Sequence, residues 1–195
     1  MSTTSTGLLR AARDPSDNAV WQRFLDLYEP LLHGWLRRQG VQHADAEELV
    51  QDVLAAVALA LPTFQHNGRT GAFRCWLRQM LVNRLRVFRR SQQVRSVCRA
   101  DSEQLHRLAE VLADADSDLS QRWGDDHDRF VAGKLLARIE PEFQPKTWRA
   151  FQRVALDGAD PDLVAAELDL SVASVYAAKS RVLKRLHEEA AGLLD

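Results

Sequence analysis

Arginine is the residue type whose number and spacing in this sequence most clearly indicate a binding function. Between Val53 and Ala100 the chain has no Asp or Glu, yet it has nine arginines: 69, 74, 78, 84, 86, 89, 90, 95 and 99. Guanidinium groups bind phosphate oxygens with paired hydrogen bonds. An arginine-rich surface without acids is therefore typical of a segment that contacts a nucleic-acid backbone.

The charge inverts directly after this segment. Residues 101–128 hold nine acids but only two cations, Arg107 and Arg122; the acids are Asp101, Glu103, Glu110, Asp114, Asp116, Asp118, Asp125, Asp126 and Asp128. The net charge of −1 for the whole chain hides this separation. The distribution of charged residues along the chain therefore says more about binding partners than the net charge does.

Three stretches with helical periodicity must position the arginines. An apolar stripe from Trp21 to Leu36 is interrupted by Pro30 and indicates two consecutive helices or one kinked helix. A second helix is predicted from about Asp45 to Leu61, and residues 62–72 read as a loop. A third, over 73–90, carries Phe73, Trp76, Leu77, Met80, Leu81, Leu85 and Phe88 on one side. Arginines 74, 78, 86, 89 and 90 fall on the opposite side, whereas Arg84 falls in the apolar arc and its role stays open.

The acidic segment reads as a linker between two domains. Apart from a short possible helix at 105–112, residues 93–128 show no sustained apolar stripe. The charge inversion near residue 100 suggests a hypothesis: in the free protein, the acidic linker folds back on the arginine face and weakens DNA binding until a partner pulls the domains apart.

The last third of the chain predicts a helix-turn-helix. Asp160 and Pro161 suit the start of a short helix over 161–168, and Ser171 can cap a second helix that runs to about Glu189. Val175, Ala178, Val182 and Leu186 would face inward on that second helix, and six side chains would face outward: Tyr176, Ala177, Ser180, Arg181, Lys184 and His187. Such a face can offer hydrogen bonds and positive charge to a major groove; the alternative is an ordinary amphipathic helix pair.

Other classes of function find little support. The six histidines are scattered, no HExxH occurs, and the loop with Gly68 and Gly71 lacks a P-loop lysine, so we expect no catalysis and no cofactor. Cys75 and Cys98 lack the spacing of a zinc site and read as ordinary thiols. No secretory signal or membrane-spanning run is apparent, which favours a cytoplasmic protein.

Three motifs together resemble the extracytoplasmic-function sigma factors of the sigma-70 family. DAEELVQDV (45–53) with LPTF (61–64) resembles the helix that binds core RNA polymerase, and FRCWLRQMLVNRLRVFRR (73–90) resembles the promoter-melting and minus-ten helices. LDLSVASVYAAKSRVLKRL (168–186) resembles the minus-thirty-five motif. The resemblance implies an all-α fold of two small helical domains: a region 2-like domain (1–92), the acidic linker (93–128) and a region 4-like domain (129–195).

The resemblance also implies partners and site residues. Core RNA polymerase would bind Asp45, Glu48, Leu49, Gln51 and Asp52; the spacing of the three acids places them on one helix face. Minus-ten DNA would contact Phe64, Arg74, Arg78, Asn83, Arg86, Arg89 and Arg90, with Phe64 and Asn83 holding an extruded base, while Phe73 and Trp76 read as core. Minus-thirty-five DNA would contact Tyr176, Ala177, Ser180, Arg181 and Lys184. The free protein is expected to be a monomer, and an anti-sigma protein remains open as a further partner.

Some positions depart from the family pattern. Asp169 stands at a turn where Gly is frequent, Val87 where Asp is common, and Ala58 where an aromatic residue is common. Asp accepts the left-handed conformation less readily than Gly but better than most residues, so the turn should survive. A polymerase-independent helix-turn-helix regulator is the alternative reading; it would require a dimer interface, for which no heptad is visible.

Overall fold

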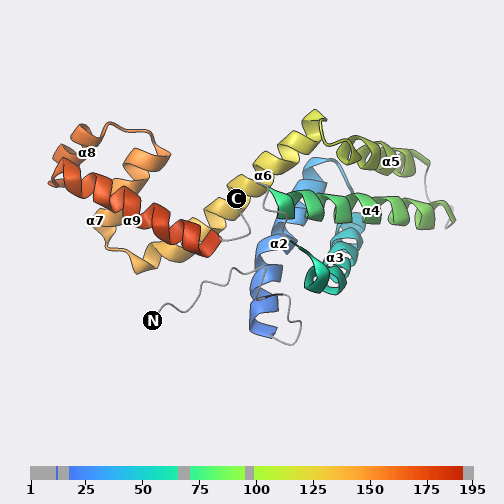
Figure 1. Ribbon diagram of the computed structural model, residues 1–195. Coiled ribbons are helices and arrows are strands. Elements are labelled where there is room, and N and C mark those ends of the chain that lie inside the picture. Colours follow the sequence, from blue (N-terminus) through green and yellow to red (C-terminus); the bar gives the residue numbers. More distant parts are fainter. Residues whose placement is uncertain (1–11, 13–17, 66–70, 95–98, 191–195) are drawn as a thin grey trace. The chain divides into compact units, whose positions relative to one another are not determined.

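The computed structural model describes residue 12 and residues 18–65, 71–94 and 99–190. Every regular element in these ranges is helical, as predicted (Figure 1). The described chain divides into an N-terminal unit that ends at Val131 and a C-terminal unit that begins at Ala132. No helix in the described ranges is long and apolar enough to cross a membrane.

The first two helices of the N-terminal unit supply most of its core. α2 (Asn18–Arg38) is one helix that includes Pro30, so of the two sequence alternatives the single helix is the one observed. Gly40, with φ of +80°, allows the chain to turn into α3 (His43–Ala60), which is followed by the 3-10 turn η1 (Leu61–Thr63). Residues 66–70 of the predicted loop lie outside the described ranges.

Helix α4 (Ala72–Val94) is buried along more of its circumference than the sequence suggests. Phe73, Leu77, Leu81, Leu85 and Phe88 are buried, and they form the predicted apolar stripe, in which Trp76 and Met80 are half-buried. Val82 lies outside that stripe and is nevertheless completely buried. A second layer must therefore cover α4 on another side.

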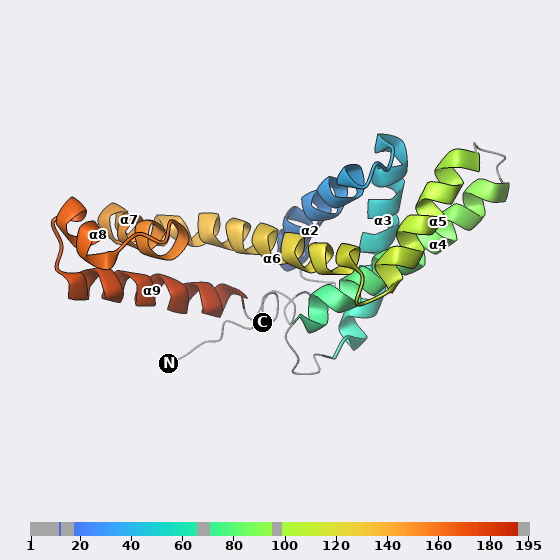
Figure 2. The same cartoon turned by 90° about the horizontal axis from the view of Figure 1, so that it is seen from above.

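That second layer is made by the segment that the sequence analysis interprets as a linker. The chain forms α5 (Arg99–Ala113) and then α6 (Asp118–Ile139), and α5 lies alongside α4 (Figure 2). Leu105, Leu108, Ala109 and Leu112 on α5 and Trp123 on α6 are buried. The structure thus differs from the expected linker over residues 99–128: exposed acids such as Glu103, Glu110 and Asp125 lie on helices whose few apolar residues pack inward.

The α5–α6 connection is held by hydrogen bonds rather than left open. Ser117 Oγ donates to the backbone oxygen of Val111 at 2.7 Å, and Ser120 Oγ donates to that of Leu112 at 3.0 Å. Ser117 Oγ also accepts from the backbone N–H of Ser120 at 3.1 Å, as an N-cap does. The turn therefore fixes α5 against the start of α6.

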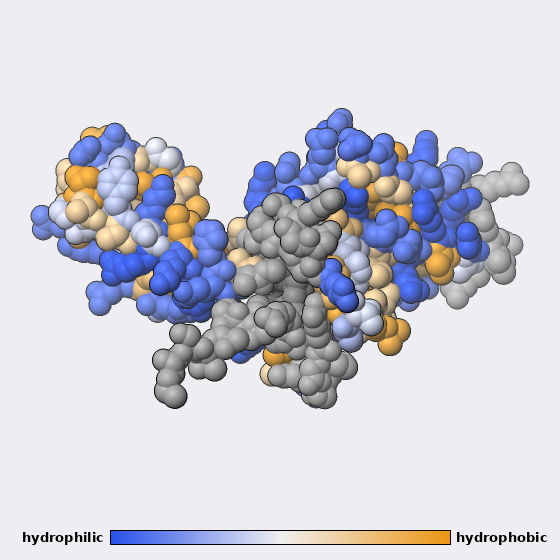
Figure 3. All heavy atoms as spheres, viewed as in Figure 1, coloured by the Kyte–Doolittle hydropathy of each residue, from blue (hydrophilic) through white to orange (hydrophobic). Residues whose placement is uncertain are grey.

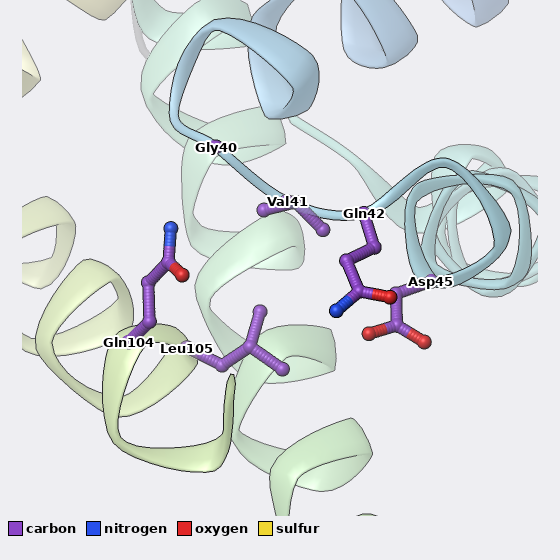
Figure 4. A pocket seen from close by; sticks show the side chains of 6 residues that line it. All are labelled: Gly40, Val41, Gln42, Asp45, Gln104 and Leu105. Atoms are coloured by element: carbon purple, nitrogen blue, oxygen red, sulfur yellow. The ribbon is translucent and has the colours of Figure 1, made fainter. Parts of the chain in front are cut away.

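Helix α5 also reaches the turn between α2 and α3. Gln104 Nε2 donates to the backbone oxygen of Gln39 at 3.0 Å. Gln104 and Leu105 line a small hollow together with Gly40, Val41, Gln42 and Asp45 (Figure 4). The volume of this hollow is about 10 Å³. A hollow of this size holds about one water molecule, so it belongs to the packing between the segments rather than to a ligand site.

The C-terminal unit is built around the last helix. The end of α6 leads through the 3-10 turn η2 (Glu140–Glu142) to α7 (Pro145–Phe151) and the π-helical turn η3 (Gln152–Leu156), and then to α8 (Pro161–Leu168) and α9 (Val172–Ala190). Its core contains Ala150 and Phe151 of α7, Val164 of α8, and Val175 and Val182 of α9. Arg185 on α9 donates to both carboxylate oxygens of Glu142, at 2.7 and 2.9 Å, and ties the two ends of the unit together.

The two helices predicted for this part of the chain are present, with the predicted residues at their starts. Asp160 Oδ1 accepts from the backbone N–H of Asp162 at 2.8 Å at the start of α8, and Ser171 Oγ accepts from that of Ser174 at 3.1 Å at the start of α9. Asp169 ends α8 with φ of +51°, in the left-handed region. The turn between α8 and α9 therefore forms with Asp rather than Gly at its left-handed position.

We expect this left-handed residue to limit the stability of the C-terminal unit. Replacing Asp169 with Gly removes the steric cost of a Cβ at positive φ, and should raise the free energy of unfolding by up to about 1 kcal/mol. Replacing Asp169 with Ala keeps the Cβ but removes the carboxylate, which makes Asp more tolerant of positive φ than Ala. D169A should therefore lower the free energy of unfolding by up to about 1 kcal/mol. Thermal unfolding of the three proteins, followed by circular dichroism, measures both changes. If D169A proves as stable as D169G, backbone strain at this turn has no influence.

Candidate nucleic-acid interface

The predicted polymerase-binding residues fall into two groups on α3. Glu48, Gln51 and Asp52 are exposed and Asp45 is half-buried, and the 3 and 4 spacings of the acids place them on one face. Leu49 is completely buried and belongs to the core. The prediction that Leu49 contacts the polymerase is therefore wrong. Leu49 precedes Val53 by four residues and continues the inward stripe of α3.

Leu59 extends the acidic face and was not singled out from the sequence. It lies seven residues after Asp52, two helical turns along the same face, and its side chain is 83% exposed. The available signal was that Leu59 falls outside the apolar stripe of this helix. The face therefore presents carboxylates together with one large apolar side chain.

Three of the predicted DNA-binding arginines on α4 are engaged within the N-terminal unit. Arg74 forms an ion pair with Asp128 of α6. Arg86 Nη2 lies 3.1 Å from Oε1 of Glu110, and Arg89 Nη1 lies 2.7 Å from Nδ1 of His106, both on α5. These three arginines thus have partners on α5 and α6. Hydrophilic side chains gather on the surface over α4 and α5 (Figure 3).

The rest of α4 leaves an open stripe. Cys75, Gln79, Asn83 and Arg90 are exposed, at spacings of 4, 4 and 7 residues that keep them on one side of the helix. Gln79 Nε2 donates to Oδ1 of Asn83 at 3.1 Å and orients that amide. Arg78, another predicted contact, is half-buried, and so is Arg84, whose role the sequence left open. The open stripe offers hydrogen-bonding groups and one cation to an external partner.

Phe64 packs into an aromatic cluster beside α4. Only 9% of its surface is exposed, and its ring lies 5.0 Å from that of Trp76 and 5.6 Å from that of Phe73 in an edge-on arrangement. Phe73 is buried and Trp76 half-buried, in keeping with their expected place in the core. Phe64 is thus a core residue rather than the exposed base contact that was predicted, and the half-buried Trp76 supplies the aromatic rim next to the open stripe.

Arg74 is the centre of a network that joins α6 to α2 and α4. His127 is completely buried; its Nδ1 donates to Oδ1 of Asp128 at 2.9 Å, and its Nε2 lies 3.5 Å from the hydroxyl of Tyr28. Trp123 Nε1 donates to the backbone oxygen of Arg74 at 3.1 Å. Sequence reasoning singled out neither Trp123 nor His127.

The charges of this network stabilise the ionised form of Asp128. Partial burial alone would raise the pKa of this carboxyl, but hydrogen bonds from His127 and Arg74 outweigh it and bring the pKa below its ordinary value. Burial, with the negative charge of Asp128 as the smaller cause, raises the pKa of Tyr28 well above the usual value. Gly71 leaves room for Arg74, since a Cβ there would lie 2.6 Å from the guanidinium carbon. Arg74 therefore links α4 to α6 within the N-terminal unit.

On α9, the predicted DNA-facing residues lie where the sequence placed them. Tyr176, Ala177, Ser180, Arg181 and Lys184 are all exposed, while Val175, Ala178 and Val182 are buried against α7 and α8. Arg181 Nε donates to the backbone oxygen of Ala177 at 3.3 Å. This face combines one aromatic side chain, a hydroxyl and two cations without acidic residues between them.

Comparison with known proteins connects the N-terminal unit to transcription. Residues 24–95 match the family described as Sigma-70 region 2, whose members bind core RNA polymerase and promoter DNA. No curated protein matches the chain's sequence significantly. Within the described residues, no group of three or more His, Cys, Asp or Glu side chains could hold a metal ion. The matched residues, 24–95 of the 195-residue chain, lie within the N-terminal unit, so the similarity to Sigma-70 region 2 concerns that unit.

Proposed function

We propose that this protein is a sigma factor of the extracytoplasmic-function group, which binds core RNA polymerase and directs it to specific promoters. The observation that carries the proposal is the order of two features in one chain. A segment that matches sigma-70 region 2 (24–95) is followed by two capped helices joined by a tight turn (161–190), and the second helix has an exposed face without acids over 176–184. The N-terminal unit would act as a region 2-like domain and the C-terminal unit as a region 4-like domain.

The acidic face of α3 is our proposed docking surface for the polymerase. Glu48 and Asp52 are exposed and would meet a basic partner helix, and charge complementarity of this kind steers association. The exposed Leu59 would add an apolar contact at the end of the same face. Leu49 has no direct part in this proposal, because it is buried.

The open stripe of α4 and the aromatic rim beside it would contact the minus-ten strand. Asn83 can hydrogen-bond the edge of an extruded base, and the half-buried Trp76 offers ring surface for stacking, whereas the buried Phe64 packs against that ring. Binding energy from captured bases offsets the few kcal/mol needed to unstack them, so promoter opening needs no catalytic group.

The exposed face of α9 would read the minus-thirty-five duplex. Tyr176, Ala177 and Ser180 lie toward the N-terminal half of the helix, where recognition helices approach base edges. Arg181 and Lys184 would contact phosphates, a contribution that depends on salt but not on sequence.

A mobility shift with sigma-free bacterial core polymerase, followed by run-off transcription from the gene's own upstream region, tests the proposal. We expect a complex with core polymerase that starts transcripts at a defined position. A protein that ignores core polymerase but binds duplex DNA as a dimer would instead be a polymerase-independent regulator. Gel filtration of the free protein separates the two as well, because a sigma factor of this kind should elute as a monomer.

A further inference from the structure

Helix α5 offers the arginines of α4 an internal alternative to DNA. Glu110 and His106 lie four residues apart on α5, and they contact Arg86 and Arg89, which lie three residues apart on α4. Because Arg89 can only donate, His106 accepts its hydrogen bond through Nδ1. Each arginine is thus bound by a group that takes the place a phosphate oxygen would occupy.

These two contacts lie at the outer edge of the helix pair. The side chains of Arg86 and Glu110 are 39% and 53% exposed, and the contact between Arg89 and His106 is exposed as well. The arginine side chains can therefore exchange partners by rotating, without movement of the helices. Arg74 differs from them, because its partner Asp128 is part of the network around the buried His127.

The buried side of α5 argues against lifting of the whole helix. Leu105, Leu108 and Leu112 are buried in the N-terminal unit, and all three would become exposed to water if α5 separated from α4. The hydrogen-bonded turn at 114–120 opposes the same movement. The contacts between α5 and the arginines of α4 can therefore change through side-chain rotation while α5 stays packed against α4.

We propose that α5 is an internal competitor for DNA phosphate, which holds Arg86 and Arg89 through Glu110 and His106 and lowers the DNA affinity of the free protein. The inference rests on the proposed function, because it assigns DNA as the external ligand of α4. When DNA binds, the two arginines transfer from α5 to phosphate, and Arg74 keeps its structural role.

The test compares Glu110→Gln with Asp126→Asn in the full-length protein. Both substitutions remove one negative charge from the N-terminal unit, but Asp126 pairs with Arg38 of α2, at 3.0 Å, rather than with α4. Binding of each protein to a fluorescent single-stranded oligonucleotide is measured by anisotropy at several salt concentrations. We expect E110Q to bind about three- to fivefold more tightly than D126N, with a salt dependence steeper by about 0.7 in log–log slope, the value for one added phosphate contact on a single strand.

Equal affinities for E110Q and D126N would overturn the proposal, as would the absence of measurable binding by either protein at low salt. An E110Q gain that survives the added change Arg86→Gln would overturn it too, since the gain must come from the freed arginine. Glu110 is exposed, so we expect E110Q to have the melting temperature of the wild type. If the melting temperature of E110Q changes, E110D, which shortens the side chain, is compared with D126N instead. Because the assay contains no polymerase, its result is separate from that of the core-binding test.

Discussion

Replacing Trp123 with Ala is expected to destabilise the N-terminal unit by about 3–5 kcal/mol, the usual range for removing a large aromatic side chain from a core. The side chain is 1% exposed, its ring meets that of Trp35 edge-on at 5.1 Å, and its Nε1 donates to the backbone of Arg74. Chemical denaturation followed by circular dichroism measures the change as a lower midpoint for the N-terminal unit.

Trp21→Ala is the matched control, because it removes the same side chain from a half-buried position. Trp21 stacks on Phe24 with 5.1 Å between the ring centroids, but it contributes less buried surface. The variant should therefore lose clearly less stability than W123A. If the two variants are equally stable, α6 is not an integral part of the N-terminal unit, and the residues after Val94 act as a separate segment.

The free energies of leucine burial and of an exposed ion pair indicate how α5 and α4 can respond to a ligand. Each buried leucine contributes about 1.5–3 kcal/mol, so separating the three leucines of α5 from the core costs several kcal/mol. An exposed pair such as Arg86 with Glu110 contributes about 0–1 kcal/mol. Exchange of the arginine side chains is therefore far cheaper than separation of the helices, and under the proposed function it is the step that DNA binding would drive.

The parts of the fold that depend on local signals could be predicted from the sequence. The caps at Asp160 and Ser171 and the inward positions of α9 follow from residue types at fixed spacings, and all appear in the structure as expected. The inward stripe of α4 likewise follows from its period of 3.6 residues. Such signals need no knowledge of which element packs on which.

The parts that depend on long-range packing could not be predicted in the same way. Trp123, His127 and Val131 form a buried stripe at spacings of four, but the central residue is polar and acids surround it, so the stripe resembles a solvated segment. Its burial depends on partners far away in the chain: Tyr28, Trp35 and Arg74. The same packing explains why Arg74, predicted to contact DNA, is held inside the unit. It also explains why the folded unit continues to Val131, beyond the family match that ends at residue 95.

Asp52→Arg is expected to weaken binding to core RNA polymerase by about 10- to 100-fold, or about 1.4–2.7 kcal/mol. Under the proposed function, Asp52 lies in the middle of the exposed acidic face and meets a basic helix of the polymerase. Reversing its charge replaces an attraction with a repulsion between like charges, which are costly when an interface brings them together. The mobility shift with sigma-free core polymerase, titrated to a dissociation constant, measures the effect.

Glu47→Arg provides the control on the same helix. Glu47 is exposed and pairs with His43, and at 100° per residue its side chain points away from the face that holds Glu48 and Asp52. The two variants have the same net charge, so long-range attraction to the polymerase changes equally in both, and only the local contact differs. E47R should keep nearly the affinity of the wild type at moderate salt, where long-range effects are screened. Equal losses in both variants would mean that total charge, rather than the acidic face of α3, governs docking.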